Sequence, residues 1–309
     1  MKLGSYAFSK CTGLRSIALP EGLDTIGENC FEESGLTEVH MASSVSVICS
    51  RAFSDCSDLK CITLPAGIET IEDGCFQRSG LVEIAIPRGV TQIKSGAFCE
   101  CRALKKAQLP RGVEALWDRC FEGAALAEIE IPNSVTAIKC AAFRKCSSLS
   151  KVTFVEGMKL KELGQSAFRG CGSMAVRLPD GLEVIPESCF AESGIVEVHI
   201  PASVRKIQCS HYSGVFSDCR SLKAVTFAAG STLAEIGDRA FWNCAKLRDI
   251  AIPQSVTYVG TECFRNSGVR KKTLPFHVKQ GENVFNDEPE YSFDFDYDVK
   301  FDTHFLDFL

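Results

Sequence analysis

The strongest feature of the chain is a hydrophobic pattern that returns every 22 to 26 residues. Each unit contains a phenylalanine followed by an alternation of the form L-x-x-[VI]-x-[LI]-P, as in LVEIAIP and LAEIEIP. A shorter motif, [SG]-[VLI]-x-x-I, then precedes the next phenylalanine, as in SVTAI at 134–138. The recurring phenylalanines are Phe8, Phe31, Phe53, Phe76, Phe98, Phe121, Phe143, Phe168, Phe190, Phe216, Phe241 and Phe264.

A unit this short cannot bury its own apolar side, so the repetition predicts a solenoid in which stacked units share one core. The alternating segment predicts one half-buried parallel strand per repeat. The proline after it ends the strand, at a position where no backbone N–H is needed for hydrogen bonds to the neighbouring strand. The A-F-x-x-C segment predicts a single helical turn on the opposite side. About twelve strands spaced by roughly 4.8 Å give a body about 55 Å long.

The pattern resembles the BspA-like leucine-rich repeat family over about residues 3–275. The residues that carry the resemblance in one unit are Val135, Ile138, Ala142, Phe143, Cys146, Leu149, Val152 and Phe154. Units 152–171 and 225–244 match the family's longer variant. The resemblance implies a curved leucine-rich-repeat solenoid over residues 1–275, which leaves 276–309 as a separate tail. It also suggests a binding role, since family members are often surface proteins that attach to host molecules or other cells.

The chain departs from the family at its beginning. The first residues, MKLGSYAFSKC, contain no apolar stretch of the kind found in a secretion signal. They also start within a repeat, which suggests that an N-terminal cap is missing.

The cysteines follow the same period as the phenylalanines. There are seventeen, an odd number, so they cannot all pair within one chain. Twelve occur once per unit, either directly before the phenylalanine or three residues after it, and a small residue takes the other position. The two positions share a face of a helical turn. The exchange therefore predicts that cysteine packs in the core as a small hydrophobe.

Adjacent units carry cysteine at the same position in two places, Cys146 with Cys171 and Cys219 with Cys244. A disulfide needs Cα atoms within about 7 Å, and like positions elsewhere are two units, roughly 10 Å, apart. We therefore expect that only these two pairs can form a bridge along a column. Five cysteines lie outside the rule, and we expect Cys61 and Cys99 to be the more exposed. These five are Cys49, Cys61, Cys99, Cys140 and Cys209.

Composition and charge argue against several classes of protein. The 309 residues are 45% hydrophobic and 24% charged, without a run of 18 apolar residues, so no membrane span is expected. Residues 287–309 hold eight acidic residues and one lysine, a net charge of −7. The net charge of the whole chain is −5, so the remainder sums to about +2. This gives no electrostatic reason to expect nucleic acid binding.

No motif for catalysis, a cofactor or a metal is present. Only Cys99-x-Cys101 brings two cysteines close in sequence, and its spacing differs from the pairs of zinc sites. His40 and His199 occupy the same strand position seven repeats apart, so they cannot meet, and we expect both to be solvated. The sequence has neither a glycine-rich phosphate loop nor a serine nucleophile elbow. We therefore expect no enzymatic activity, no cofactor and no metal site.

A partner protein has two candidate docking places on the solenoid. Glu83, Lys106, Glu128 and Lys151 fall at outward positions of neighbouring strands, on the side that the resemblance implies is the concave face. They either pair with one another, at well under ~1 kcal/mol per contact, or they form the footprint of a partner. An insertion at 208–215 adds His211 and Tyr212. Insertions in solenoids often map to binding loops, and the alternative is a tolerated surface loop.

The tail is an amphipathic segment of period two. In YSFDFDYDVKFD (291–302), polar residues alternate with Tyr291, Phe293, Phe295, Tyr297, Val299 and Phe301. This spacing is typical of a strand with one aromatic and one acidic face. Such a strand either caps the open end of the solenoid, as terminal repeats require, or docks into a partner subunit.

These observations favour a non-enzymatic scaffold that binds other proteins, as a subunit or binding module of a larger assembly. The alternative is a cell-surface adhesin that binds host or matrix proteins, which the family resemblance suggests. The thiol-rich core and the absence of a secretion signal favour an intracellular or organellar location over the cell surface. The sequence does not indicate an oligomeric state.

Overall fold

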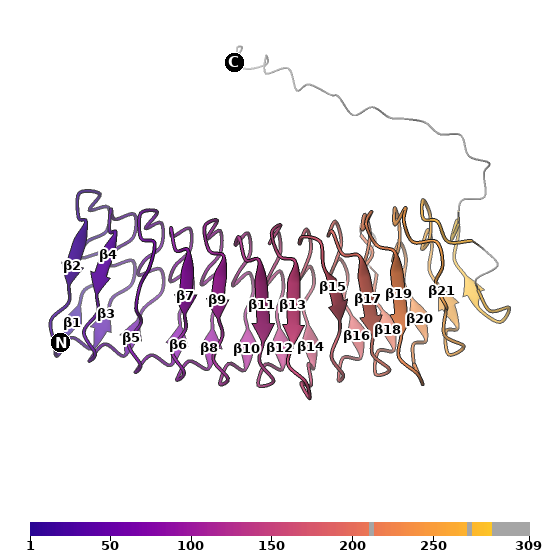
Figure 1. Ribbon diagram of the computed structural model, residues 1–309, viewed down its shortest axis with the longest axis horizontal. Coiled ribbons are helices and arrows are strands. Elements are labelled where there is room, and N and C mark those ends of the chain that lie inside the picture. Colours follow the sequence, from indigo (N-terminus) through magenta and orange to yellow (C-terminus); the bar gives the residue numbers. More distant parts are fainter. Residues whose placement is uncertain (210–212, 271–273, 286–309) are drawn as a thin grey trace, which may run out of the picture.

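The computed structural model describes residues 1–209, 213–270 and 274–285. They form one stack of coils along the long axis of the molecule, with two parallel series of strands on neighbouring sides of the stack (Figure 1). This confirms the predicted leucine-rich-repeat solenoid of about twelve turns, with parallel strands in register from coil to coil.

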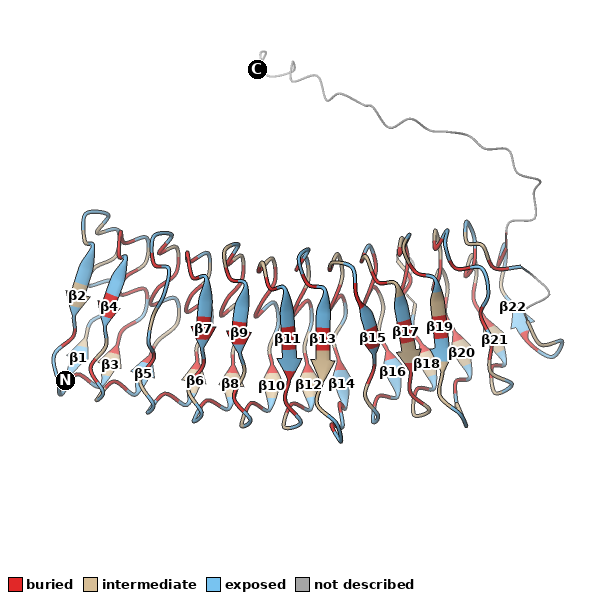
Figure 2. Ribbon diagram, viewed as in Figure 1, coloured by how far each residue is buried: buried red, intermediate tan, exposed pale blue. Residues whose placement is uncertain are grey.

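The first series comes from the predicted L-x-x-[VI]-x-[LI] segments. Its strands are β2 (Ser16–Ala18), β4 (Glu38–His40), β7 (Glu83–Ala85), β9 (Lys106–Gln108), β11 (Glu128–Ile131), β13 (Lys151–Phe154), β15 (Ala175–Arg177), β17 (Glu197–Ile200) and β19 (Ala224–Phe227). We call the outward side of this series the long-strand face. In most of these strands a buried central residue lies between two exposed neighbours, as Figure 2 shows. The segments 59–64 and 247–252 carry the same pattern without forming a strand.

The second series consists of two-residue strands that were not predicted from the sequence pattern. They arise from the [SG]-[VLI]-x-x-I motif, where two residues are too few to show a period of two. The strands are β1 (Lys2–Leu3), β3 (Thr25–Ile26), β5 (Val47–Ile48), β6 (Thr70–Ile71), β8 (Gln92–Ile93), β10 (Ala115–Leu116), β12 (Ala137–Ile138), β14 (Glu162–Leu163), β16 (Val184–Ile185), β18 (Lys206–Ile207), β20 (Glu235–Ile236), β21 (Tyr258–Val259) and β22 (Lys279–Gln280).

The segment around each phenylalanine is not the predicted helical turn, and the described residues contain no helix. The second residue after each phenylalanine from Phe8 to Phe264 has a positive φ, for example Asp55 (59°) and Lys145 (59°). The second residue before it is also left-handed in most coils, as in Arg51 (φ 56°). A right-handed helix cannot contain two left-handed residues four apart. The chain therefore makes successive turns, and the backbone bonds to the next coil.

A continuous column of phenylalanine rings forms the centre of the core. From Phe8 to Phe285, successive ring centroids lie 5.2–5.6 Å apart, and the planes differ by 2–16°. The column continues beyond the boundary predicted at residue 275, because β22 pairs with β21 and Phe285 stacks on Phe264. The sequence GENVF lacks the cysteine and the following leucine, so the pattern did not reveal this coil.

The cysteines that repeat once per unit lie in the core, as predicted. Eleven of the twelve are buried, and Cys11 in the first coil is partly exposed. Cysteines that follow phenylalanine by three donate from Sγ to the phenylalanine carbonyl of the preceding coil. Examples are Cys56 to Phe31 O at 3.0 Å and Cys101 to Phe76 O at 2.9 Å. Where serine takes this position, its hydroxyl lies 3.4 Å from the sulfur of the next coil, as in Ser79 and Cys101. The alternation therefore also places a hydrogen-bonding partner beside several of the thiols.

The corner between phenylalanine and the long strand has two lengths. Units with serine after phenylalanine use S-G followed by leucine, isoleucine or valine, which is one residue shorter than the cysteine-containing corner. The shorter corner sits against its neighbour, since a Cβ at Gly80 would lie 2.0 Å from the backbone oxygen of Ser57. Gly35 faces Thr12 O in the same way, at 2.1 Å. Glycine is therefore required here by a close approach of two backbones.

We expect Gly80→Ala to lower the free energy of unfolding by about 1–3 kcal/mol, because the corner must move away from Ser57 to admit a methyl group. Chemical denaturation of the two proteins measures the difference. Gly13→Ala is the matched control in a longer corner, where a Cβ meets nothing within 4 Å. Equal losses in the two variants would contradict the close-packing argument.

Candidate functional site

The four charged residues predicted as a partner footprint lie on the long-strand face. Glu83 of β7 is in register with Lys106 of β9, and Glu128 of β11 is in register with Lys151 of β13. All four side chains are exposed. The strands keep them pointing outward because each lies beside a central residue that is buried in the core, such as Ile84 or Ile129.

These four charges do not neutralise one another. Within the part of the chain that the structure describes, none of them has an ion-pair or side-chain hydrogen-bond partner. The mutual pairing considered from the sequence is therefore not present in this structure. The charges remain hydrated and available to a partner, and their role as a footprint stays a prediction.

A hollow of about 230 Å³ lies further along the same face, over β15, β17 and β19. The register places Ala175 and Ala224 on either side of Glu197. The next outward row is Arg177, His199 and Thr226. The hollow forms because the two alanine side chains are too short to fill the space beside Glu197. Arg177 and Glu197 have no side-chain partner among the described residues. One depression therefore presents a positive and a negative group, neither of which is held by an ion pair.

His199 in this hollow is less exposed than the solvated strand residue expected from the sequence. It is partly buried, and its Nδ1 lies 2.9 Å from Thr226 Oγ1. Burial, followed by the neighbouring Arg177 guanidinium, holds the pKa of His199 below its usual value of 6.5. His40 on β4 is exposed, with its Nε2 3.2 Å from Glu38. The sequence signal that could have distinguished the two histidines is the pair of alanines at the positions flanking Glu197.

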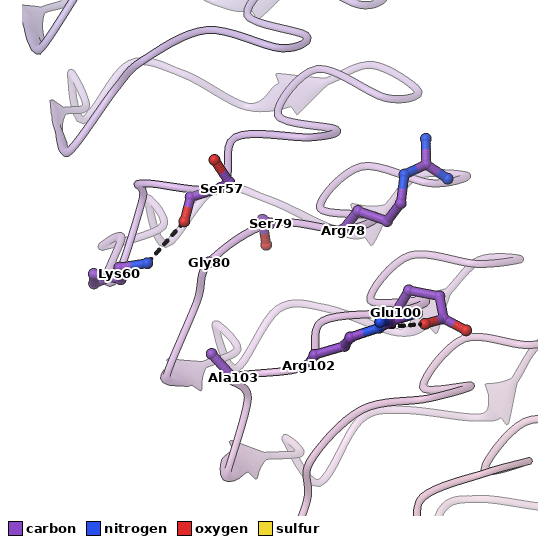
Figure 3. Close-up of a pocket in the computed structure, with 8 residues that line it drawn as sticks. All are labelled: Ser57, Lys60, Arg78, Ser79, Gly80, Glu100, Arg102 and Ala103. Atoms are coloured by element: carbon purple, nitrogen blue, oxygen red, sulfur yellow. Dashed lines mark hydrogen bonds and ion pairs between the residues drawn. The ribbon is translucent and has the colours of Figure 1, made fainter.

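A second depression, of about 330 Å³, lies at the short corner of Gly80 (Figure 3). It is bordered by Lys60, Arg78 and Arg102, but each cation is held by a neighbour. Lys60 Nζ donates to Ser57 O at 2.7 Å, and Arg102 Nε donates to Glu100 at 2.9 Å. Arg78 donates two hydrogen bonds to Asp55, at 2.6 and 2.8 Å. The long-strand face, where charges lack partners, is therefore the better candidate site.

The remaining predicted contact residues cannot be placed. His211 and Tyr212 lie outside the described residues, as do Tyr291, Phe293, Phe295, Tyr297 and Phe301.

All seventeen cysteines are free thiols in this structure. The pairs predicted to be able to form disulfides occupy like positions in adjacent coils, each sulfur donating to a phenylalanine carbonyl. Their acceptors are Phe121 for Cys146, Phe143 for Cys171, Phe190 for Cys219 and Phe216 for Cys244. Whether either pair forms a bridge stays a prediction.

The cysteines outside the rule differ in exposure. Cys61 and Cys140 are exposed, and Cys61 was predicted to be so. The prediction for Cys99 was wrong, because its side chain is 97% buried on the phenylalanine side of the coil. It occupies the position directly after Phe98, beside Arg119 and the buried Glu122.

The chemistry of the thiols does not suggest nucleophiles. Burial raises the pKa of Cys30 and Cys56 to about 11 and that of Cys101 and Cys146 to about 12. A reactive cysteine needs the opposite shift. Across the described residues, no three histidine, cysteine, aspartate or glutamate side chains gather in a way that would hold a metal ion. The same residues form no helix with the length and apolar character needed to cross a bilayer.

The raised thiol pKa values predict a loss of stability in alkaline solution. The folded pKa of Cys101, about 12, lies above its unperturbed value of 9.0, so its stabilisation is complete below about pH 9 and is lost as the pH rises towards 12. We expect the free energy of unfolding to fall by up to about 1.4 kcal/mol per pH unit for this thiol. Denaturation experiments between about pH 8 and 11 give the free energy of unfolding at each pH. This free energy should fall less steeply with pH for Cys101→Ala than for the unmodified protein.

The exposed Cys61→Ala is the matched control for this measurement. Its slope should equal that of the unmodified protein. Equal slopes for all three proteins would show that burial of Cys101 does not link stability to pH.

Comparison with known proteins agrees with this geometry. The crystal structure of a leucine-rich repeat protein from Bacteroides ovatus shows the same fold. It has 25% sequence identity and a TM-score of 0.65, and the match covers 90% of this chain and 86% of that one. A leucine rich cell surface protein from Faecalibacterium prausnitzii has 25% identity and a TM-score of 0.53, covering 93% and 83%. A leucine-rich repeat protein from Eubacterium ventriosum has 19% identity and a TM-score of 0.53, and the match covers 91% of this chain and 84% of that one. At this identity the likeness shows the fold alone.

No curated protein matches the chain. The BspA type leucine rich repeat region matches residues 1–105, 70–194, 116–214 and 184–300, which together span nearly the whole chain. A repeat fold of this kind is in general a binding scaffold without enzymatic activity, and it indicates a protein-interaction module. The chain belongs to the BspA-type leucine-rich repeat family.

Proposed function

We propose that this protein is a non-enzymatic scaffold that binds another protein on its long-strand face, as part of a larger assembly. The observation that carries the proposal is the set of outward charges without partners, which runs from Glu83 to Lys151. The rigid strands fix where these charges project, so a complementary surface can meet them in one register, although each long side chain that it immobilises costs about 0.5–1.5 kcal/mol.

The chemistry of the face indicates the kind of partner. Acidic and basic residues alternate along β7, β9, β11 and β13, so a partner must present the opposite alternation at the spacing of the strands. The outward positions of these four strands contain no aromatic residue, and aromatic residues dominate the energetic centres of tight interfaces. The interaction should therefore be moderate in affinity and weakened by salt.

The hollow over β15, β17 and β19 supports a second contact on the same face. Arg177 and Glu197 offer a donor and an acceptor to one projecting loop, and the alanines beside Glu197 leave room for a side chain. The two contacts lie along one line of strands, which suits an extended partner surface.

We expect Lys106→Glu with Lys151→Glu to weaken binding by about tenfold or more, because the double variant reverses half of the charge alternation. Partners are captured with the unmodified protein, identified by mass spectrometry, and titrated against each variant at low and high salt. Lys145→Glu with Lys161→Glu is the matched control, since both lysines are exposed and lie off the long-strand face. Equal loss of binding in the two double variants would argue against this face as the docking surface.

A cell-surface adhesin is the second candidate function. The Faecalibacterium prausnitzii protein is described as a cell surface protein. The thiol-rich core, in which single cysteines pack and donate to backbone carbonyls, favours the scaffold and an intracellular or organellar location, since such compartments keep thiols reduced.

The two candidates predict different thiol states. Denaturing alkylation of the natively expressed protein without reduction, followed by intact mass measurement, counts the free cysteines. We expect seventeen modified thiols for the intracellular scaffold. A product with bridges, above all Cys146–Cys171 or Cys219–Cys244, would favour the adhesin.

A further inference from the structure

The first coils of the stack repeat in pairs as well as singly. Phe53 follows Phe8 by 45 positions, and Phe98 follows Phe53 by the same number. Each pair contains one short corner, at Gly35 in the first pair and at Gly80 in the second. Residues 45 positions apart at these two corners therefore occupy equivalent places in the stack.

An arginine and an aspartate meet over the first short corner. Arg15 Nη1 donates to Gly35 O at 3.1 Å and to Asp58 Oδ2 at 3.0 Å. Arg15 belongs to the coil before Gly35, and Asp58 belongs to the coil after it, so the ion pair extends across three coils. The guanidinium lies directly over the glycine, since a Cβ at this position would be 3.0 Å from Nη1. The cation at this corner thus has an acidic side chain as its partner.

The second short corner keeps the cation and lacks the acid. Lys60 stands in the place of the arginine, and its Nζ would be 2.8 Å from a Cβ at Gly80. Ala103 stands where the first corner has its aspartate. With no carboxylate at that place, Lys60 Nζ donates to Ser57 O at 2.7 Å. This acceptor is neutral, and within the described part of the chain Lys60 forms no ion pair.

The hollow of about 330 Å³ beside Lys60 and Ala103 therefore presents a positive charge that nothing compensates. Arg78 and Arg102 also border the hollow, but each is paired with a carboxylate, at 2.6 and 2.9 Å. In Figure 3 both arginines extend to one side of Gly80, and Lys60 lies on the other. An ammonium group carries three donors, and the bond to the backbone carbonyl uses one of them. Two N–H groups of Lys60 remain for a ligand.

We propose that this hollow binds an acidic side chain of a partner protein, whose carboxylate takes the place that Asp58 has at the first corner. The carboxylate accepts hydrogen bonds from the Lys60 ammonium. One exposed ion pair is too weak to hold a small free carboxylate in water, so the group must belong to a larger partner surface. The hollow lies at the corners that precede β7 and β9, and its residues are not those of the long-strand face.

The test is carbodiimide cross-linking with a short oligoglutamate peptide, which joins a carboxylate to a neighbouring lysine, followed by mass spectrometry. At low salt we expect Lys60 to be cross-linked about fivefold or more often than Lys105, because only Lys60 borders the hollow. Lys105 is the matched reference, since it is exposed and lies 45 positions further on, where Ala125 replaces the glycine. High salt should remove the preference. Equal cross-linking of the two lysines at low salt would overturn the proposal.

A variant that supplies the missing acid tests the geometry directly. In Ala103→Asp, peptide cross-linking at Lys60 should fall about fivefold or more, and without peptide the reagent should link residues 60 and 103. The matched control is Ser148→Asp, which adds the same charge at the equivalent position 45 residues further on and should leave the yield at Lys60 unchanged. An equal fall in both variants would show that net charge governs the reaction, and would overturn the proposal. Binding on the long-strand face is measured with other variants, so failure of one proposal does not decide the other.

Discussion

The stacking of one phenylalanine on the next is the contact on which the rest of the structure depends. The rings lie 5.2–5.6 Å apart from Phe8 to Phe285, so each coil is held at nearly the same distance from its neighbours. That distance permits the inter-coil backbone hydrogen bonds and brings the thiol of Cys101 to the carbonyl of Phe76. It also fixes the register of the long strands, and thereby the positions of the outward side chains.

Much of this fold can be predicted from the sequence because the determining residues recur. Phe143, Cys146 and Leu149 reappear in unit after unit, so even a single chain shows what an alignment would show. The charge alternation of Glu83, Lys106, Glu128 and Lys151 also follows from the period, since in-register stacking places equivalent residues side by side. The coil of Phe285 was missed because it lacks the cysteine and leucine that mark the others.

Other features could not be predicted because they depend on geometry that composition does not record. Arg51, Asp55 and Lys145 give no sign of a left-handed backbone, which is imposed by the bonds to the next coil. Cys99 is buried through its position beside Phe98 rather than through its own spacing. The hollow at His199 requires Ala175 and Ala224 to lie on either side of Glu197, in three successive coils. Function is harder still, because a repeat fold specifies a surface and leaves its partner open.

The alternation of cysteine and serine also bears on how such a molecule changes length. A coil with Ser79 provides the hydroxyl that meets Cys101, and its shorter corner fits against the longer one before it. The natural unit of growth is therefore a pair of coils, such as residues 76–120, because duplicating or deleting a pair preserves both the thiol column and the sequence of corner lengths. Loss of a single coil instead leaves two cysteines at like positions in adjacent coils, which is the arrangement at Cys146 and Cys171 and at Cys219 and Cys244. A coil could therefore be lost or gained singly only where the packing accepts two thiols at like positions, as it does at these two junctions.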